Sequence, residues 1–471
     1  MKIINIIILI FLTAFMAGCT SVKHVFSDIS TPEKKDFPSK IIEEKKEKTI
    51  QYEDRIAKYE LSKKEKEFLE ILKTDKYASL CSLQNEFIDL MYMPDSQTKS
   101  ELIKDMFVSY TENLANSCID QISFKETLKT NKYKKRKQYY ETYNTKIDKE
   151  KLLTKFNNEN TSVVDVLNSY APKNPVFFKL IEKLDTVNLS ESKYNKLRLN
   201  IERLKLTKDY RSENFIKLNI PSHNFTLFEN GQVERTFGTV VGEKEHQTPI
   251  LSSKLSYFII NPTWNIPDSI AKSTIIPNAL KDKNYLKRKN IVIRKNYKLD
   301  SKKFAFKDVK WKKYLKKNVK YIPYKFIQLP SRTNGMGKVK YMFQNDYAVY
   351  MHDTIGTWRF KDNREKIRFA SHGCVRLEHP ISLMKHLTTN YTPKSYKKLR
   401  KTYLKGDIDT VSLSQKLPLH ITYLTANVDE KGKLKFYKDV YEYDKIQRLN
   451  FIPHKNALEL ASLEKDFNSN I

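Results

Sequence analysis

The spacing of apolar residues changes near Asn214, and this change constrains the fold more than any other feature of the chain. Between Gln51 and Leu206 apolar residues recur at helical intervals, as in ELIKDMFVSYTENLANSCI, and glycine is absent. After Asn214 apolar and polar residues alternate, which is typical of half-buried strands. The pattern predicts an α+β organisation, with a helical N-terminal scaffold followed by a β-rich domain.

Local signals mark the ends of elements in both regions. Ser62 and Glu65 have the spacing of a capping box ahead of the apolar run FLEIL. Asn230 and Gly231 separate two strand-like runs, which predicts a β-hairpin. Pro380 is expected in the first turn of a short helix over PISLMKHL.

The chain is strongly basic, with a formal net charge of +31 over 471 residues. Such a charge favours polyanionic partners, although lysine enrichment in an AT-rich genome would give the same composition. The basic run NKYKKRKQYYETYNTKIDKEK is expected to form one solvated helix face. An anion-binding patch in the cell envelope is the alternative for this run.

The N-terminus carries an export signal. Lys2 precedes an apolar run over residues 3–15 that is too short to span a membrane comfortably, and Met-Ala-Gly-Cys19 follows. Small residues before a cysteine resemble the bacterial lipobox, which implies cleavage before Cys19 and lipidation of its sulfur; an ordinary signal peptide is the alternative. Thr20 and Ser21 favour an outer-membrane over an inner-membrane anchor. Export to the periplasm excludes a cytosolic nucleic-acid function.

Composition along the chain divides it into segments. Residues 20–50 are polar and rich in lysine and glutamate, as expected of a flexible tether, and residues 280–325 form a lysine-rich, lid-like insertion. The predicted segments are the lipoprotein signal peptide 1–19, the tether 20–50, the helical scaffold 51–206, the β-rich catalytic domain 207–450 and the tail 451–471.

Export also bears on the cysteines, of which the chain has 4. With Cys19 lipidated, an oxidising compartment would permit a disulfide between Cys81 and Cys118. Two separately buried cysteines would give the same pattern. If the disulfide forms, Cys374 is left as the odd free thiol, which makes it a candidate reactive group.

Cys374 lies in the segment FASHGCVRLEHP, where a nucleophilic thiol would need a base nearby. His352 lies 22 residues upstream, at the end of the strand-like run YAVYMHD, and a hairpin-like return would bring it beside Cys374. Asp353 should point to the opposite face of the strand, so a backbone carbonyl is the expected partner of the imidazole. These residues predict a Cys–His dyad.

Neighbours of the thiol have further expected roles. The amides of Gly373 and Cys374 could face an oxyanion, because glycine permits close approach of the backbone. Arg376 shares a face with Cys374 in extended chain and could hold a carboxylate. His372 is expected to support the loop through a hydrogen bond, and His379 to be a bystander.

The segment around Cys374 also admits two readings without a dyad. A zinc site could use His352, His372, Cys374 and His379, but the close ligand pairs of structural zinc sites do not occur in this chain. The cysteine could also be buried and inert. We expect neither a metal nor a cofactor.

SHGCVRL, preceded by a strand ending in YMHD, resembles the catalytic domain of L,D-transpeptidases of the YkuD type, whose signature is a His followed by (S/T)HGC. The similarity covers about residues 195–450, includes LNIPSHNFTLFENGQ and GKVKYMFQNDYAVYMHDT, and is to the larger periplasmic subgroup. Many members of that subgroup carry a peptidoglycan-binding repeat module, and none is evident in this sequence. Wall binding would then depend on the basic helical part, the insertion or a partner protein.

The resemblance implies a reaction. Cys374 would attack the carbonyl after the third residue of a peptidoglycan tetrapeptide stem, with His352 as the base, and D-Ala would leave. An amine of a neighbouring stem would resolve the thioester and cross-link two third-position diamino acids. Carbapenems would acylate the same thiol. The resemblance also assigns His372 and Gly373 to the nucleophile loop and a substrate-binding role to Ser371, Arg376, Tyr350 and Trp264.

Three alternatives share some of these features. Water could replace the amine acceptor, which would make the protein an L,D-carboxypeptidase, or the thioester could attach a lipoprotein to the wall. A non-catalytic wall-binding scaffold lipoprotein is the alternative from a different class. The expected partners are peptidoglycan stem peptides, the membrane through a lipid anchor, and other cell-wall synthesis proteins.

Overall fold

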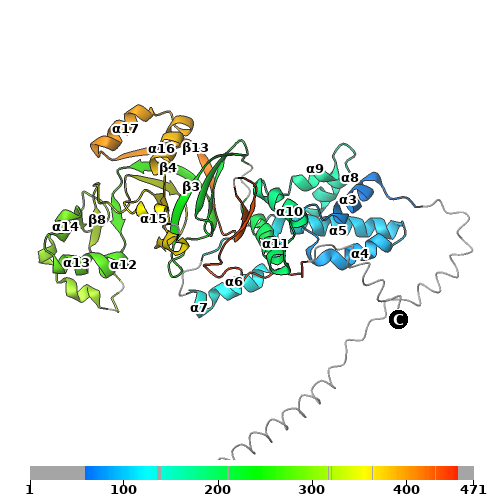
Figure 1. Cartoon of the computed structure of the whole chain (residues 1–471), viewed down its shortest axis with the longest axis horizontal. Helices are drawn as coiled ribbons and strands as arrows, with labels where there is room; N and C mark the ends of the chain where they lie inside the picture. Colours follow the sequence, from blue (N-terminus) through cyan, green and yellow to red (C-terminus); the bar gives the residue numbers. More distant parts are fainter. Residues whose placement is uncertain are drawn as a thin grey trace, which may run out of the picture. The chain divides into compact units, whose positions relative to one another are not determined.

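The computed structural model describes residues 59–134, 139–208, 212–316, 318–319, 321–362, 364–429 and 431–453 (Figure 1). Residues from Leu61 onward belong to one compact unit. The predicted signal peptide 1–19 and tether 20–50, and residues 454–471 of the predicted tail, lie outside the described residues. Within the described ranges, no helix has both the length and the apolar character needed to cross a membrane.

Helices make up the N-terminal part, as the periodicity predicts. The first, α3 (Lys63–Lys73), starts at the predicted capping box: the amide of Glu65 donates to Ser62 Oγ at 3.2 Å, and the amide of Ser62 donates to Glu65 Oε2 at 2.7 Å. The other elements of this part are η1 (Cys81–Leu83), α4 (Gln84–Tyr92), α5 (Gln97–Asn116), α6 (Gln121–Lys129), α7 (Asn131–Lys134), α8 (Lys149–Asn157), α9 (Val163–Asn168), α10 (Val176–Thr186) and α11 (Glu191–Lys205).

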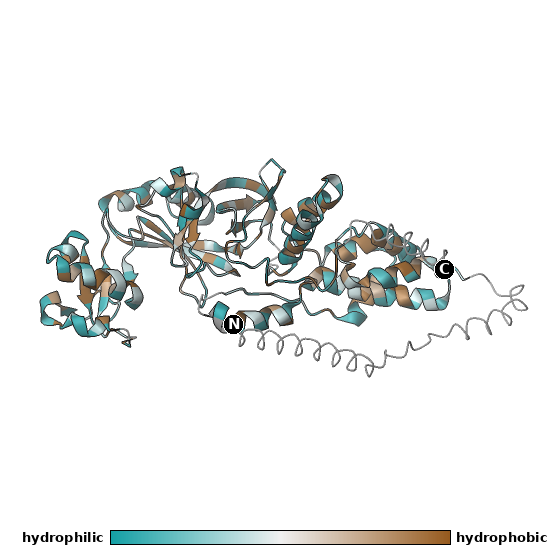
Figure 2. Ribbon diagram, turned by 60° about the horizontal axis from the view of Figure 1, so that its bottom comes forward, coloured by the Kyte–Doolittle hydropathy of each residue, from teal (hydrophilic) through white to brown (hydrophobic). Residues whose placement is uncertain are grey.

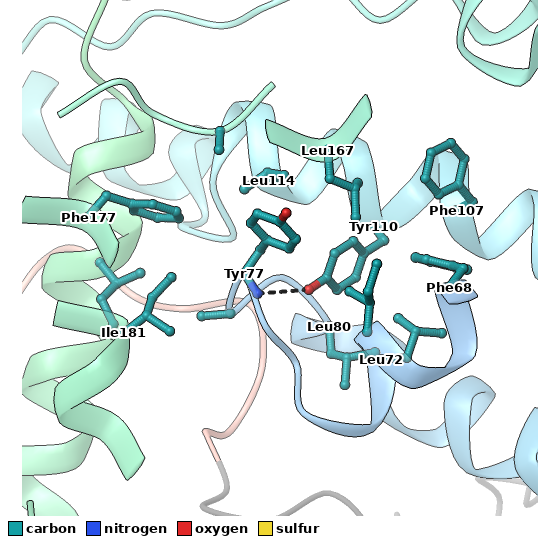
Figure 3. Close-up of a cluster of buried hydrophobic side chains, with 14 of the residues drawn as sticks. Phe68, Leu72, Tyr77, Leu80, Phe107, Tyr110, Leu114, Leu167, Phe177 and Ile181 are labelled. Carbon is teal, nitrogen blue, oxygen red and sulfur yellow. Dashed lines mark hydrogen bonds between the residues drawn. The ribbon is translucent and has the colours of Figure 1, made fainter. Parts of the chain in front are cut away.

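Aromatic rings fill the core between these helices (Figure 3). Phe68 of α3 packs edge-on against Phe107 of α5, with ring centroids 5.1 Å apart. The hydroxyl of Tyr110 accepts a hydrogen bond from the amide of Tyr77 at 3.2 Å and donates to Asp75 Oδ1 at 3.0 Å. Both tyrosines are therefore buried with their polar atoms paired, and the hydrophobic faces of the helices turn inward (Figure 2).

Cys81 and Cys118 form a disulfide that joins η1 to the segment after α5. The amide of Cys118 donates to Glu202 Oε2 at 2.7 Å, and the same carboxylate accepts from Lys205 Nζ at 2.9 Å. The bridge is therefore buried beside an ion pair of α11, and its cysteines are the two that the sequence offered as a pair.

The two halves of the sequence share their cores. The hairpin of β14 (Ala426–Val428) and β15 (Leu434–Phe436) packs into the core of the helices, against α10 and α11. Conversely, Phe124 of α6 lies in the core of the main sheet. Arg203 of α11 forms a 2.7 Å ion pair with Asp444 near the C-terminus. The helical region is thus tied to the β-rich region by buried contacts.

The β-rich part is built on a nine-stranded sheet with the order β11-β3-β12-β10-β9-β4-β13-β1-β2. The sheet closes because the first part of β3 also pairs with β2, while its last residues pair with β12 and β11. The strands are β1 (Phe215–Asn219), β2 (Asn224–Glu229), β3 (Gln232–Gly242), β4 (Leu251–Ile260), β9 (Val339–Phe343), β10 (Met351–His352), β11 (Phe369–Ser371), β12 (Val375–Leu377) and β13 (Asp409–Thr422).

Two local predictions about this sheet are confirmed. Asn230 and Gly231 connect β2 to β3 with positive φ values of 49° and 71°, as a tight hairpin turn requires. Pro380 begins helix α16 (Pro380–Tyr391), and its carbonyl accepts a 2.5 Å hydrogen bond from the hydroxyl of Tyr341 on β9. Helix α16 therefore covers the face of the sheet to which Tyr341 points; α17 (Tyr396–Lys405) follows it.

The segment between β4 and β9 forms a smaller unit with its own core. Its four-stranded sheet has the order β5-β8-β6-β7, and Trp311, Ile293 and Phe326 are buried beside it. The predicted insertion 280–325 lies inside this unit, which extends from β5 to β8. Its elements are β5 (Trp264–Ile266), α12 (Asp268–Ile270), η2 (Ala271–Ile275), α13 (Ile276–Lys281), α14 (Tyr285–Arg288), β6 (Ile291–Arg294), β7 (Lys303–Phe304), η3 (Phe306–Asp308), η4 (Trp311–Leu315) and β8 (Lys325–Gln328).

The prediction of one helix face over the basic run 131–151 is wrong. Helices α7 and α8 occupy its two ends, whereas residues 139–148 form no helix. Tyr140 makes a parallel bridge with Ile250, and the ring of Tyr139 stacks on Tyr347 with centroids 4.4 Å apart. Pairing and stacking of the tyrosines on the β-rich part override the local helical preference here.

His223 lies in the turn between β1 and β2, with a positive φ of 55°. Its ring packs against Phe369, with centroids 4.3 Å apart. Burial, helped by the charge of Arg368, lowers the pKa of His223 to about 3. The imidazole is therefore neutral in the folded protein over the whole range in which a solvated histidine titrates.

We expect the stability of the protein to fall in mild acid partly because of this residue. Because the pKa of His223 is lower in the folded protein than its value of about 6.5 in the unfolded chain, its contribution to stability is complete only above pH 6.5 and is lost as the pH falls. One such group lowers the free energy of unfolding by about 2 kcal/mol between pH 7 and pH 5. His223→Asn removes the titration, and asparagine tolerates positive φ. Urea denaturation at both pH values should show a smaller pH dependence for the variant; equal dependence in both proteins would contradict the assignment.

Candidate active site

Three polar side chains form a row across the closed sheet. His352 of β10 pairs with Arg376 of the parallel strand β12 and with Lys340 of the antiparallel strand β9. Residues in register on neighbouring strands lie on the same face. Arg376, His352 and Lys340 therefore point to one side of the sheet, while their neighbours Val375, Met351 and Tyr341 point into the core.

Cys374 and Tyr350 come directly before strands β12 and β10. Each precedes a member of the row by two residues, and the amide of Val375 donates to the carbonyl of Tyr350 at 3.0 Å. The hydroxyl of Tyr350 hydrogen-bonds to the Cys374 sulfur. The charges of Lys340 and Arg376, the two strand partners of His352, also act on the Cys374 thiol. Cys374 and His352 thus have the same two cationic neighbours, and their action as a dyad stays a prediction.

His352 is almost fully buried, at 3 % exposure, and its ring is oriented by the backbone. Its Nδ1 lies 2.5 Å from the carbonyl oxygen of Asp353, and the backbone of Met336 also accepts a hydrogen bond from the ring. Burial, followed by the charge of Arg376, lowers the pKa of His352 to about 3. A neutral ring whose Nδ1–H donates to Asp353 keeps Nε2 available as a proton acceptor.

Asp353 does not act on the imidazole through its carboxylate. Its Oδ2 accepts from the amide of Lys338 at 2.8 Å, and its Oδ1 accepts from the amide of Thr354 at 2.7 Å. The carboxylate is used by backbone amides, as expected for a residue that points to the opposite side of the strand from His352. The prediction of a backbone carbonyl as the partner of His352 is confirmed.

The thiol of Cys374 is half-buried and is not part of a disulfide. Burial raises its pKa, while hydrogen bonds from Tyr350 and the charges of Lys340 and Arg376 act in the opposite direction. Lys340 Nζ lies 3.6 Å from the centroid of the Tyr350 ring. The resting pair is therefore a thiol and a neutral imidazole, with two cations placed to stabilise a thiolate once it forms.

Residues 371–374, the nucleophile loop, are held by their own hydrogen bonds. The buried hydroxyl of Ser371 donates to the carbonyl of Cys374 at 2.6 Å and accepts from the amide of Gly373 at 3.2 Å. Gly373 has a φ of 106°, which strongly favours glycine, and its carbonyl accepts from Thr248 Oγ1 at 2.8 Å. The loop is therefore fixed on both sides of the cysteine.

These bonds correct two expectations from the sequence. The amide of Gly373 already donates to Ser371, so it does not face an oxyanion, and the amide of Cys374 stays the candidate donor. Ser371 is only 2 % exposed and uses its hydroxyl within the loop, so it organises the loop instead of contacting a substrate.

The other predicted residues have distinct positions. His372 is exposed, and its ring lies 4.4 Å from that of His246, measured between centroids. The ring of His379 lies 6.0 Å from that of Phe237, in keeping with a bystander. Among the described residues, no group of potential metal ligands includes Cys374, His352 or His379. The four-residue zinc site is therefore not assembled.

The smaller unit, from β5 to β8, approaches the face of the main sheet that carries Arg376, His352 and Lys340. Trp264 packs over Gly335, where an added Cβ would lie 2.9 Å from the indole, and Gly335 precedes Met336 at the His352 ring. Tyr297 is close enough to Tyr350 to influence its ionisation. Trp264 thus lies against the segment that contacts His352, and its role in substrate binding stays a prediction, whereas Tyr297 was not foreseen.

Sequence reasoning also missed Lys340. The alternation of VKYMF places it on the face opposite Tyr341, and this signal was available. The register between β9 and β10, which sets Lys340 against His352, has no local signal in the sequence.

The β-rich domain thus carries Arg376, His352 and Lys340 in one row, and Cys374 precedes Arg376 by two residues. Residues 213–397 match the family model of the L,D-transpeptidase catalytic domain (YkuD). Strand β13 lies beyond the matched residues, although it is part of the same sheet. The α+β prediction, a helical region followed by a β-rich domain, is confirmed.

A protein of Haemophilus influenzae, provisionally named an L,D-transpeptidase, is 27% identical over 292 residues; the match covers 61% of this chain and 56% of that protein. The chain thus spans little more than half the length of this relative. An L,D-transpeptidase from Mycobacterium smegmatis is 13% identical, with a TM-score of 0.20, and covers 45% of this chain and 58% of its own. The avibactam carbamoyl enzyme of Ldtfm is 12% identical, with a TM-score of 0.22, and covers 45% and 49%.

Proposed function

We propose that the protein is a peptidoglycan L,D-transpeptidase that forms cross-links between third-position diamino acids through a thioester on Cys374. The observation that supports this most is that a thiol, Cys374, and a neutral imidazole, His352, share Lys340 and Arg376 as cationic neighbours, within residues that match the L,D-transpeptidase catalytic domain. The family implies a peptidoglycan substrate.

The proposed reaction starts with proton transfer. His352 Nε2 takes the proton of the Cys374 thiol as sulfur attacks the carbonyl carbon of the third residue of the donor stem. The amide of Cys374 stabilises the resulting oxyanion. When the C–N bond to D-Ala breaks, the imidazolium returns its proton to the leaving amine. The acceptor amine then attacks the thioester, gives its proton to His352, and releases the thiol.

Lys340, Arg376 and Tyr350 have supporting roles in this proposal. The two cations and the phenol hydroxyl surround the sulfur and favour its thiolate form during attack. Arg376 is also near Arg359, whose charge contributes to lowering the pKa of Arg376. Two arginines at the edge of the row suit a substrate carboxylate, such as that of a stem peptide.

Replacing Lys340 by methionine should make the thiol less reactive at neutral pH. Loss of the ammonium removes a charge that lowers the pKa of Cys374, so the rate of iodoacetamide alkylation at pH 7 should fall roughly tenfold and its pH profile should move to higher pH. The measurement is mass spectrometry of the Cys374 peptide against time. Lys416→Met, at an exposed position of β13, is the matched control; a fall of the same size there would contradict this role of Lys340.

Incubation with purified tetrapeptide muropeptides tests the proposed function. Dimers joined between third-position residues support transpeptidation, and tripeptide monomers alone would assign L,D-carboxypeptidase activity. A carbapenem should form an adduct on Cys374 that mass spectrometry detects. Absence of both products and adduct would contradict the enzyme proposal and favour a wall-binding scaffold.

We further propose that the protein is anchored in the periplasm by lipidation of Cys19, with the outer membrane as the favoured location. The proposal rests on the lipobox-like Met-Ala-Gly-Cys19 and the short apolar run before it. Mass spectrometry of the mature N-terminal peptide tests it: diacylglycerol on Cys19 is expected, and a Cys19→Ala variant should remain unprocessed at this site.

A further inference from the structure

An exposed group of metal-ligating side chains lies beside the nucleophile loop. It consists of Glu243, His246 and His372, whose ligand atoms all lie within 4.8 Å of one another. Glu243 Oε1 is 2.8 Å from His246 Nδ1 and 4.0 Å from His372 Nε2. The two imidazole rings are side by side, with an interplanar angle of 31°. The donor set is two imidazoles and one carboxylate.

The backbone holds these three residues in place. The amide of Glu243 donates to the carbonyl of Ser371 at 3.0 Å, and the amide of His246 donates to the carbonyl of Glu243 at 3.1 Å. A Cβ at Gly242 would lie 2.2 Å from the carbonyl oxygen of His246, so the turn depends on glycine. The turn 243–246 and the nucleophile loop are thus attached to each other, and only side-chain rotation is needed to converge the ligand atoms.

The other groups of this kind in the described part of the chain are less suited to a metal. Cys81 and Cys118 are joined in a disulfide next to Glu202. In the remaining group, His386 Nε2 lies 2.7 Å from Glu229, and His386 Nδ1 lies 2.8 Å from a guanidinium nitrogen of Arg235. The positive charge of this arginine disfavours a metal ion there. By contrast, the side chains of Glu243, His246 and His372 are 39 %, 41 % and 57 % exposed, so an ion can reach all three.

We propose that Glu243, His246 and His372 bind a zinc-class divalent transition metal, with water completing the coordination. Imidazole donors favour such metals over calcium or magnesium, and two histidines with one carboxylate form a known type of three-residue zinc site. In a tetrahedral site with bonds near 2.0–2.1 Å, neighbouring ligand atoms are about 3.4 Å apart. The distances from Glu243 Oε1 to His246 Nδ1, 2.8 Å, and to His372 Nε2, 4.0 Å, lie on either side of that value.

The metal would join the turn 243–246 to the nucleophile loop through His372, the residue before Gly373. Occupancy would restrict the movement of this loop and so slow the access of reagents to Cys374. The metal site itself does not depend on the proposed function. It gives His372 the role of a metal ligand.

Metal titration of the untagged full chain tests the site. Cys374→Ala serves as the parent protein, because it removes the thiol as a competing ligand. Co²⁺ absorption and Zn²⁺ calorimetry should show one ion per chain, and His246→Ala or Glu243→Gln in this parent should weaken binding at least tenfold. His379→Ala, which alters another histidine of the same segment, should bind like the parent. No binding, or binding that neither His246→Ala nor Glu243→Gln weakens, would overturn the proposal.

The effect on the loop has a separate readout that needs no enzymatic turnover. In the chain that retains Cys374, Zn²⁺ should slow alkylation of this thiol several-fold, and His246→Ala should abolish the slowing. Slowing of equal size in His246→Ala would mean that the metal acts on the thiol itself and would overturn the proposed coupling. A failure of the muropeptide assay would leave both metal readouts interpretable, so the two proposals fail separately.

Discussion

Cys374→Ala is expected to abolish cross-linking and thioester formation, with a loss of at least about 10³-fold in turnover of tetrapeptide stems. Alanine removes the sulfur and leaves the backbone of the nucleophile loop unchanged, because the hydrogen bonds of Ser371, Gly373 and Thr248 do not involve the thiol. The measurement is chromatography of muropeptide products over time, together with the carbapenem adduct by mass spectrometry.

Cys374→Ser is the companion variant for this prediction. The hydroxyl has nearly the same shape, but its much higher pKa makes it a poor nucleophile beside a neutral imidazole, so we expect a loss of similar size. Thermal unfolding should show that both variants keep the stability of the parent. Retention of full cross-linking activity by Cys374→Ala would favour a non-catalytic scaffold.

His352→Asn is expected to lower the acylation rate by about 10²- to 10⁴-fold, the usual contribution of a general base. The asparagine amide can replace Nδ1–H as the donor to the carbonyl of Asp353, while no atom replaces Nε2 as the proton acceptor. The variant therefore separates the orienting hydrogen bond from proton transfer. Single-turnover formation of the carbapenem adduct on Cys374 measures the rate.

The pH dependence of the acylation rate also tests the role of His352. Because burial and Arg376 lower the pKa of His352 to about 3, the imidazole stays neutral well below pH 6.5, and the parent protein should show no acidic limb near that value. In His352→Asn the residual rate should rise with pH as the thiol ionises by itself. His379→Asn is the control and should be unaffected; an acidic limb near pH 6.5 in the parent would contradict the buried neutral base.

Much of the chemistry could be predicted from the sequence because it depends on residue type and local spacing. SHGCVRL and the upstream His352 identified the pair, and the alternation of a strand placed Asp353 on the other side, where its carboxylate indeed binds amides. The helix cap at Ser62 and the hairpin turn at Asn230 could also be predicted, because each depends only on neighbouring residues. The basic run 131–151 was misjudged because its tyrosines find distant partners that no window of sequence contains.

By itself, the sequence determined the α+β division and singled out Cys374, His352 and Gly373 as candidates for the chemistry, since periodicity, thiol chemistry and backbone freedom are properties of short segments. Only the tertiary structure decided that Lys340 faces His352, that the amide of Gly373 is used by Ser371, and that His246 approaches His372. Register between strands and contacts between distant loops are set by burial of the whole sheet, and the same strand would present other neighbours after a shift of one residue.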